Sequence, residues 1–227
     1  MDVYVSKEDD LLPEVAKEFF EANYQKLNPN QNHVFQRIKK LVEDKTNDGK
    51  LIFLDAPGGT GKTFTLNVLI SWIKMNNLEV AISATSGKNS LAIIDEGPML
   101  DRLCYEAIER TMRDVVPDEH QSKKFSGKIM LISGDFRQLL PVIEKGNRSA
   151  IVNHTIKKSA LWDNVETLKL TQNMRVYNEK IKYPNNIEIH QELENHEKCL
   201  LNLGENYLPK QGSVDGSNII EVPQHDL

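Results

Sequence analysis

Continuous apolar runs alternate with stretches of helical periodicity along most of this chain. The apolar runs cover residues 51–54, 78–84, 90–94, 128–133 and 165–170. Each predicts a strand buried on both faces, because apolar residues follow one another without polar alternation. Apolar residues three and four positions apart predict helices between them, for example over 64–73 and from Pro98 onward. Strands that alternate with helices predict an α/β fold: a parallel sheet with helices on both faces and a ligand site at the carboxyl ends of the strands.

A glycine-rich turn joins the 51–54 strand to the helix that follows it. Its sequence is Ala-Pro-Gly-Gly-Thr-Gly-Lys-Thr, the phosphate-loop pattern with Ala56 in place of the opening glycine. Glycines let successive backbone N–H groups converge on phosphate oxygens, and the helix N-terminus adds the positive end of its dipole. We expect Lys62 to reach the β- and γ-phosphates of ATP and the Thr63 hydroxyl to ligate Mg²⁺. The residues expected to hold the nucleotide here are Gly58, Gly59, Thr60, Gly61, Lys62 and Thr63.

Polar residues at the ends of later strands supply the chemistry of hydrolysis. Asp95 directly follows the third predicted strand and is expected to hold Mg²⁺ against Thr63, while Glu96 is expected to orient and deprotonate the attacking water. Gln138 follows the fourth strand and can sense the γ-phosphate or the water. Arg175, taken to end the fifth strand, can supply positive charge to the transferred phosphoryl group. The predicted catalytic residues are therefore Lys62, Glu96, Gln138 and Arg175.

Composition and charge narrow the class of protein. The 227 residues are 39% hydrophobic and 27% charged, which is typical of a soluble globular chain. No apolar run approaches membrane-spanning length and the acidic start is unlike a signal peptide, so we expect no membrane partner. The net charge of −5 argues against nucleic-acid binding by the whole surface. It leaves room for a local basic groove at one of the two lysine clusters, 123–128 or 157–158.

The two cysteines and the chain ends complete this picture. Cys104 and Cys199 lie far apart and fit no disulfide, which predicts a reducing intracellular compartment; the helical spacing around Cys104 predicts a core position. Residues 1–26 read as a polar helical lead-in, 27–176 as the nucleotide-binding domain and 177–227 as a loosely structured extension. His190 and His196 lie near Cys199, but a fourth ligand is missing and the spacing is irregular, which disfavours a zinc site.

Four motifs in one order carry a family resemblance. They are APGGTGKTF, IIDEGPM, GDFRQLLPV and LTQNMR. Over about residues 27–175 they resemble the Pif-type (petite-integration-frequency) DNA helicases, particularly the branch carried by Helitron transposons. The resemblance implies a RecA-like P-loop NTPase domain and an ATP-driven motor that moves 5′ to 3′ on single-stranded DNA. It also implies roles in DNA repair, recombination and telomere maintenance, and a nuclear location.

The same resemblance assigns one further binding residue. It gives Gln31, in the motif Leu-Asn-Pro-Asn-Gln, the recognition of adenine. A side-chain amide can bond both N6 and N7 of that base.

The chain also departs from the family pattern in two places. Only residues 85–89 separate the second predicted strand from the third, whereas a parallel crossover needs about a dozen residues. So short a link can close a hairpin, which would reverse one strand and carry Asp95 to the wrong end of the sheet. By the resemblance, a long segment that helps to grip DNA is missing between Gly87 and Leu91, and the chain stops where a second RecA-like domain would begin.

We therefore expect an incomplete helicase, in which nucleotide binding survives better than hydrolysis and hydrolysis better than unwinding. One alternative is a non-catalytic nucleotide- or DNA-binding remnant. Another is a P-loop kinase acting on a small molecule, which the GDFRQ motif and the absence of a substrate lid disfavour.

Overall fold

The structure is a computed structural model that describes residues 12–44, 49–78, 80–81, 91–116, 121–205, 210–214 and 217–220. The chain divides into two compact units, Met1–Gln172 and Asn173–Leu227. The first contains the parallel sheet and the predicted nucleotide site. The second contains two helices and a small antiparallel hairpin.

Among the described residues, the sheet of the first unit has five strands, all parallel, in the order β2-β3-β4-β1-β5. They are β1 (Lys50–Asp55), β2 (Val80–Ala81), β3 (Leu91–Ile94), β4 (Ile129–Gly134) and β5 (Glu166–Lys169). The central strand β1 ends level with its neighbours, because Asp55 lies opposite both Gly134 of β4 and Lys169 of β5. The carboxyl ends of these strands therefore form one edge, as the alternation of strands and helices predicted.

The direction of β3 corrects one expectation. Leu91 lies opposite Val80 of β2 and Ile129 of β4, with parallel pairing on both sides. The hairpin that so short a link could close is therefore not formed, the predicted parallel sheet is confirmed, and β3 ends at the same edge of the sheet as β1. The link over residues 85–89, and most of the predicted 78–84 strand, lie outside the described residues.

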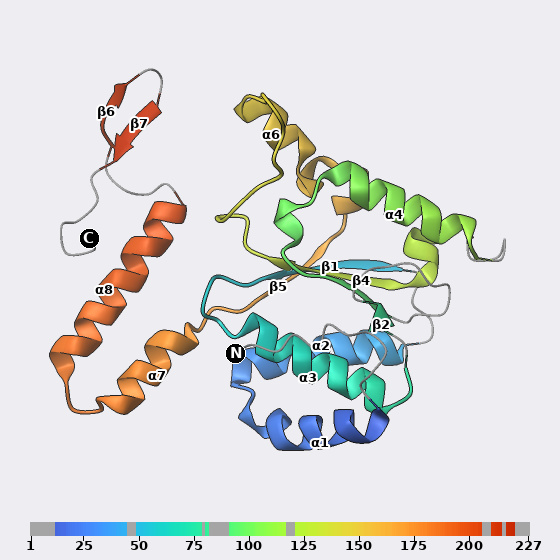
Figure 1. Cartoon of the computed structure of the whole chain (residues 1–227), viewed down its shortest axis with the longest axis horizontal. Helices are drawn as coiled ribbons and strands as arrows, with labels where there is room; N and C mark the ends of the chain where they lie inside the picture. The colour runs from blue at the N-terminus through green and yellow to red at the C-terminus, as the bar shows by residue number, and fades with distance from the viewer. Residues whose placement is uncertain are drawn as a thin grey trace. The chain divides into compact units, whose positions relative to one another are not determined.

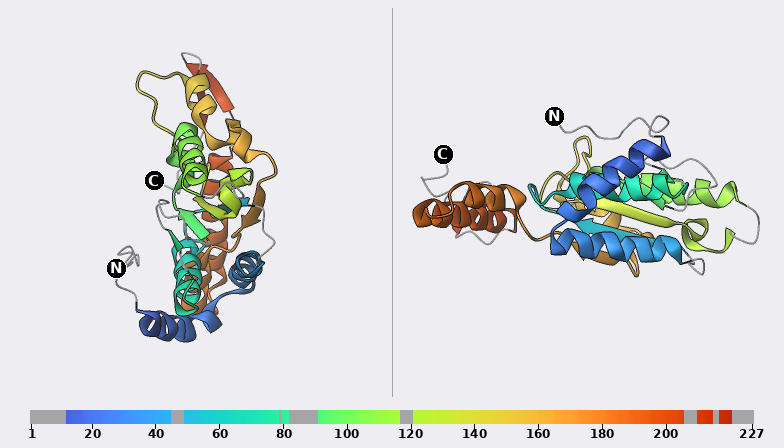
Figure 2. Two further views of the ribbon diagram at one scale, coloured as in Figure 1. Left: turned by 90° about the vertical axis from the view of Figure 1, so that its right-hand side faces the viewer. Right: turned by 90° about the horizontal axis from the view of Figure 1, so that it is seen from below.

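Helices cover both faces of the sheet, as predicted (Figures 1 and 2). On one face lie α1 (Pro13–Asn23), α2 (Pro29–Glu43) and α3 (Lys62–Met75); on the other lie α4 (Arg102–Asp114), α6 (Arg148–His154) and the short turns η3 (Lys124–Gly127), η4 (Ile156–Lys158) and η5 (Ala160–Trp162). Alternate residues of β1 serve the two layers: Ile52 packs toward α2 and α3, and Phe53 packs toward α4. Both faces of each strand are therefore buried, which explains why the apolar runs in the sequence are continuous.

The N-terminal helix packs onto this first layer. Rings of Phe20 and Tyr24 stack with centroids 5.0 Å apart, and both contact Phe35 of α2. Tyr24 begins η1 (Tyr24–Lys26), the turn that connects α1 to α2. The apolar residues of the predicted lead-in therefore form part of the core of the first unit.

Cys104 is exposed, which corrects its predicted place in the core. The buried face of α4 is formed by Tyr105, Glu109 and Met112, at spacings of four and three residues. Successive residues of a helix point about 100° apart, so Cys104 projects away from that face. The helix also begins at Arg102, after the turn η2 (Gly97–Met99), rather than at Pro98.

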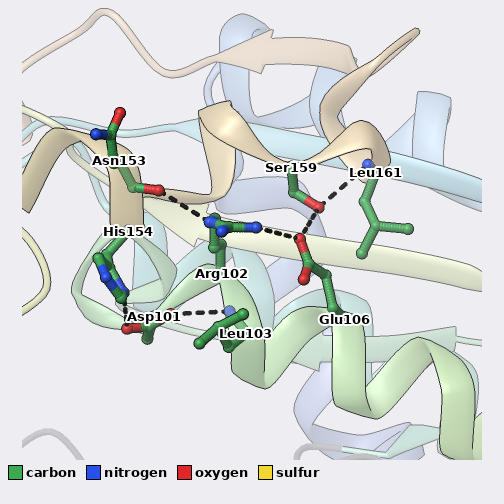
Figure 3. A network of polar contacts seen from close by, with 8 residues as sticks. All are labelled: Asp101, Arg102, Leu103, Glu106, Asn153, His154, Ser159 and Leu161. Atoms are coloured by element: carbon green, nitrogen blue, oxygen red, sulfur yellow. Dashed lines mark hydrogen bonds and ion pairs between the residues drawn. The ribbon is translucent and has the colours of Figure 1, made fainter. Parts of the chain in front are cut away.

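A polar network fastens the end of α6 to the beginning of α4 (Figure 3). Asp101 caps α4 by accepting from the Leu103 N–H at 2.8 Å, and its other oxygen lies 2.6 Å from His154 Nδ1. Burial alone would raise the pKa of Asp101, but hydrogen bonds from the Leu103 N–H and His154 outweigh it and lower that pKa. Arg102 completes the attachment by donating to the Asn153 carbonyl oxygen at 2.9 Å.

The second unit is a helical hairpin followed by a β-hairpin. Its elements are α7 (Met174–Lys182), α8 (Ile187–Gly204), β6 (Lys210–Val214) and β7 (Ser217–Ile220). An ion pair between Lys180 and Glu194 joins the two helices, and His190 Nε2 lies 2.9 Å from the Tyr183 carbonyl oxygen. Neither α7 nor α8 contains a buried residue.

Candidate nucleotide-binding site

The phosphate loop connects β1 to α3 and curls over the helix N-terminus. Gly59 and Gly61 have φ values of 84° and 79°, a left-handed conformation that residues with a Cβ rarely adopt. The Thr60 hydroxyl donates to the Pro57 carbonyl oxygen at 2.8 Å, which closes the turn. Ala56 is 2% exposed and belongs to the core beneath α2 and α3, so its methyl group packs away from the loop interior. The missing opening glycine therefore leaves the cradle intact.

Lys62, the first residue of α3, contacts both predicted acidic residues. Its Nζ lies 2.8 Å from Asp95 Oδ1 and also contacts Glu96 Oε1. The side chains of Lys62 and Asp95 are each 14% exposed, whereas that of Glu96 is 48% exposed. Burial alone would lower the pKa of Lys62, but its hydrogen bonds to the two carboxylates outweigh burial and raise that pKa. The structure thus brings three predicted site residues together around one positive charge.

The Asp95 carboxylate is fixed by neighbours on two strands. Its Oδ1 accepts a hydrogen bond from Ser133 Oγ at 2.6 Å and another from the Glu96 N–H at 2.9 Å. Glu96 itself has φ 51° and ψ 34°, a left-handed conformation that is strained for a glutamate. Gly97 then passes so close to β4 that an added Cβ would lie 2.1 Å from Ile132 Cγ2. This tight turn directs Glu96 toward solvent while Asp95 stays in the site.

The same residues suit a magnesium ion. Asp95 and the half-buried Thr63, second residue of α3, offer a carboxylate and a hydroxyl oxygen, which are ligands that Mg²⁺ prefers. The carboxylate already holds a cation, the Lys62 ammonium. The donor set and its charge therefore fit the expected metal.

An arginine that the sequence analysis did not select ties two strand ends together. Arg137 donates through Nε to Asp135 Oδ1 at 2.6 Å and through Nη2 to Asp55 Oδ1 at 3.1 Å. Asp55 is the last residue of β1, and Asp135 directly follows β4. Arg137 thereby links the strand before the phosphate loop to the GDFRQ motif. In the sequence, Arg137 follows Asp135 by two positions within GDFRQ, and this spacing is the signal that could have identified it as a site residue.

Gln138 lies beside the phosphate loop. Its Nε2 is 3.4 Å from Asp135 Oδ2, and a Cβ added at Gly58 would lie 4.0 Å from the same nitrogen. The side chain is exposed. The structure therefore brings this predicted residue to the loop.

Gln31 is buried against the other side of that loop. It is 2% exposed, and its Nε2 donates to the Thr60 carbonyl oxygen at 3.1 Å. Its Oε1 accepts from the Asn28 N–H at 3.0 Å, while the Asn28 side chain accepts from the Gln31 N–H at 2.8 Å. This capping box opens α2. One donor hydrogen and one acceptor lone pair of the amide remain, the number that an adenine edge requires.

Arg175 does not end a strand, contrary to the sequence prediction. It is the second residue of α7, and its N–H donates to the capping side chain of Asn173 at 3.0 Å. Asn173 begins the second unit, so the structure does not assign Arg175 to the site.

In the described part of the chain no group of three or more His, Cys, Asp or Glu residues could hold a metal, and the histidines of α8 form no such cluster. No described helix is long and apolar enough to cross a membrane.

A parallel sheet, a phosphate loop after β1 and an acidic pair after β3 define a P-loop NTPase of the RecA-like class. A family model described as PIF1-like helicase matches residues 26–93 and 86–213, which is most of the chain. The chain belongs to the PIF1-like helicase family.

Solved structures with a similar fold include several Pif1 helicases. Pif1 from Candida albicans is 17% identical with a TM-score of 0.48, and the alignment covers 67% of this chain and 42% of that one. Bacteroides Pif1 in complex with ADP-AlF3 and ssDNA is 20% identical with a TM-score of 0.45, covering 68% and 47%. Bacteroides Pif1 bound to ssDNA is 15% identical with a TM-score of 0.47, covering 82% and 51%. This chain thus spans about half the length of these helicases, and no curated protein matches it.

Proposed function

We propose that this chain binds ATP with Mg²⁺ and hydrolyses it as the ATP-binding part of a Pif-type helicase that moves 5′ to 3′ on single-stranded DNA. One observation carries the proposal. Lys62 contacts both Asp95 and Glu96, so the phosphate-binding and water-activating halves of the site meet. These are the groups that phosphoryl transfer to water requires.

The contact also suggests how the site responds to ATP. Before nucleotide binds, the Lys62 ammonium is paired with two carboxylates, those of Asp95 and Glu96. A triphosphate offers Lys62 a stronger anion, and the flexible lysine stem allows the ammonium to move onto it. That movement releases the Asp95 carboxylate from Lys62, and Asp95 with Thr63 would then hold Mg²⁺, which would neutralise charge on the phosphate oxygens. It also frees Glu96, whose side chain is 48% exposed, to accept a proton from the attacking water.

The proposal extends to the partner of the chain, its branch of the family and its cellular roles. Single-stranded DNA as the partner is supported by family membership and by Pif1 structures described as ssDNA complexes. We further propose the Helitron branch, roles in repair, recombination and telomere maintenance, a nuclear location, and adenine binding by Gln31. A missing internal segment is supported by the family match falling into two pieces that meet near residue 90.

A second candidate is a remnant that binds nucleotide or DNA without turnover. It is favoured by the local structure at Arg175, which lies in α7 and does not end β5 as the sequence predicted. Without a charge-stabilising arginine, phosphoryl transfer loses a factor of about 10³ or more. Nucleotide would then bind while hydrolysis stayed near background.

ATP hydrolysis with and without single-stranded DNA separates the two candidates. The variants are Glu96→Gln and, as a matched control, Glu144→Gln, which makes the same change at an exposed turn residue. Turnover that DNA stimulates, that Glu96→Gln abolishes and that Glu144→Gln retains supports the ATPase. Binding of a fluorescent ADP without turnover in the wild-type chain supports the remnant, and failure to bind either nucleotide or single-stranded DNA would contradict both candidates.

A further inference from the structure

The first turn of α2 contacts two separate parts of the chain around the site. Gln31 donates to the Thr60 carbonyl oxygen of the phosphate loop. The preceding residue, Asn30, bonds twice to the backbone at the exit of β5: its Nδ2 donates to the Lys169 carbonyl oxygen at 2.9 Å, and its Oδ1 accepts from the Thr171 N–H at 2.8 Å. Two consecutive side chains thus join the phosphate loop to the exit of β5.

The Asn30 side chain makes the hydrogen bonds beside β5 that a neighbouring strand would otherwise make. The Leu170 N–H between its two partners points the other way, toward β1, where it donates to the Asp55 carbonyl oxygen at 2.9 Å. Lys169 and Thr171 therefore present their backbone groups to the outside of the sheet, where β5 is the edge strand. The Asn30 amide satisfies one donor and one acceptor there, as a paired strand would.

The turn that carries these two residues is well defined. Asn28 caps it, Gln31 completes the capping box, and Pro29 occupies the first helical position. Reciprocal capping bonds and a fixed proline φ leave Asn30 and Gln31 little freedom to move independently. A displacement of the Thr60 carbonyl when the loop closes on phosphate therefore passes to Asn30 through one turn of helix.

We propose that this turn transmits nucleotide binding at the phosphate loop to the exit of β5, with Asn30 as a positioning residue for the segment that leads to Arg175. The proposal rests on the proposed ATPase function. Arg175 lies four positions after Thr171, a distance of at most about 14 Å of extended chain. The position of Thr171 thus limits where the guanidinium can go.

Amide hydrogen exchange tests this transmission without requiring turnover. The variants are Asn30→Ala and a control, Arg37→Met, which removes the other described link between α2 and β5, the pair of Arg37 with Glu166. We expect ADP to slow exchange in a peptide covering 172–178 at least twofold in the wild type and in Arg37→Met, and to leave Asn30→Ala unchanged. An equal response to ADP in all three proteins, or no response in the wild type, would overturn the proposal.

Steady-state kinetics supply a second test. We expect Asn30→Ala to lower kcat by roughly tenfold, with the KM for ATP within about twofold because no contact to the nucleotide is removed. Since Asn30 acts through Arg175, the double variant Asn30→Ala/Arg175→Ala should be no slower than Arg175→Ala alone. Multiplicative losses would refute the link while leaving the ATPase intact. A wild-type chain without turnover would refute the ATPase, and hydrogen exchange would still decide on the link.

Discussion

The ion pair between Lys62 and Glu96 predicts that Glu96→Gln, in which we expect ATP hydrolysis to be lost, binds nucleotide more tightly than the wild type. In Glu96→Gln the ammonium loses one of its two anionic partners, so less interaction must be broken before Lys62 can reach the phosphates. Glu96 is 48% exposed, and ion pairs of that exposure contribute about 0.5–1 kcal/mol. Converted to affinity, this is about a two- to fivefold decrease in the Kd for ADP.

The assay is a titration with a fluorescent ADP, and a double-mutant cycle isolates the cause. A glutamate near the site also repels phosphate directly, and Glu96→Gln removes that repulsion as well. In a Lys62→Met background only the repulsion remains, so the gain from Glu96→Gln should shrink there. The same gain with and without Lys62, or weaker binding by Glu96→Gln, would refute competition for the ammonium. Glu144→Gln serves as the control for the general loss of a negative charge.

Three further predictions concern the surroundings of this pair. Lys62→Met removes the ammonium that is paired with the largely buried Asp95 carboxylate, which should lower the free energy of unfolding by about 2 kcal/mol, and Lys62→Met/Asp95→Asn should recover part of it; urea denaturation measures both. Arg137→Lys cannot bridge the ends of β1 and β4 with two nitrogens, so we expect kcat to fall by about tenfold while the Kd for ADP changes less than about twofold. Asp101→Asn keeps the cap of α4 but loses the charge that faces His154. Because the folded pKa of Asp101 lies below its ordinary 3.8, the stability advantage of wild type over Asp101→Asn should be present above pH 3.8 and vanish as the pH falls through the lowered pKa.

The phosphate loop could be predicted because its chemistry lies in one contiguous stretch. Strand, glycine turn and helix follow one another, and the left-handed φ values of Gly59 and Gly61 are what the glycines implied. The bridge by Arg137 could not be predicted in this way. Arg137 and its partner Asp55 are 82 positions apart in the sequence and meet only in the folded sheet.

The wrong predictions have physical causes of the same kind. Helical spacing indicates that α4 has a buried face but does not fix which residues form it. The buried face includes Glu109, whose carboxylate is paired with Arg113, and a buried acid is not expected from its residue type. The apolar pattern of β5 stops at Leu170, and the sequence alone does not show that the polar residues after it turn into a helix before Arg175. The cap supplied by Asn173 instead begins a helix at Met174.

The short link over residues 85–89 raised the possibility of a hairpin, but the length of a link does not by itself set the direction of a strand. β3 pairs in parallel with β2 on one side. Parallel pairing with β4 on the other side then buries Leu91 almost completely, at 0% exposure. Burial of an apolar strand between two neighbours outweighs the preference of a short link.

The register of β3 also explains how the position of the acidic pair is set by strand pairing and not by the connection before β3. Ile94 lies opposite Ile132 of β4, so the next residues along each strand, Asp95 and Ser133, come side by side, and their side chains are hydrogen-bonded at 2.6 Å. β4 in turn is in register with β1, which leads directly into the phosphate loop. The position of Asp95 relative to Lys62 is therefore set through β4 and β1, and the connection before β3 enters only by allowing that pairing. A segment lost before β3 would remove whatever that segment bound while leaving the nucleotide site assembled, which is why DNA stimulation is expected to be more sensitive to the loss than nucleotide binding.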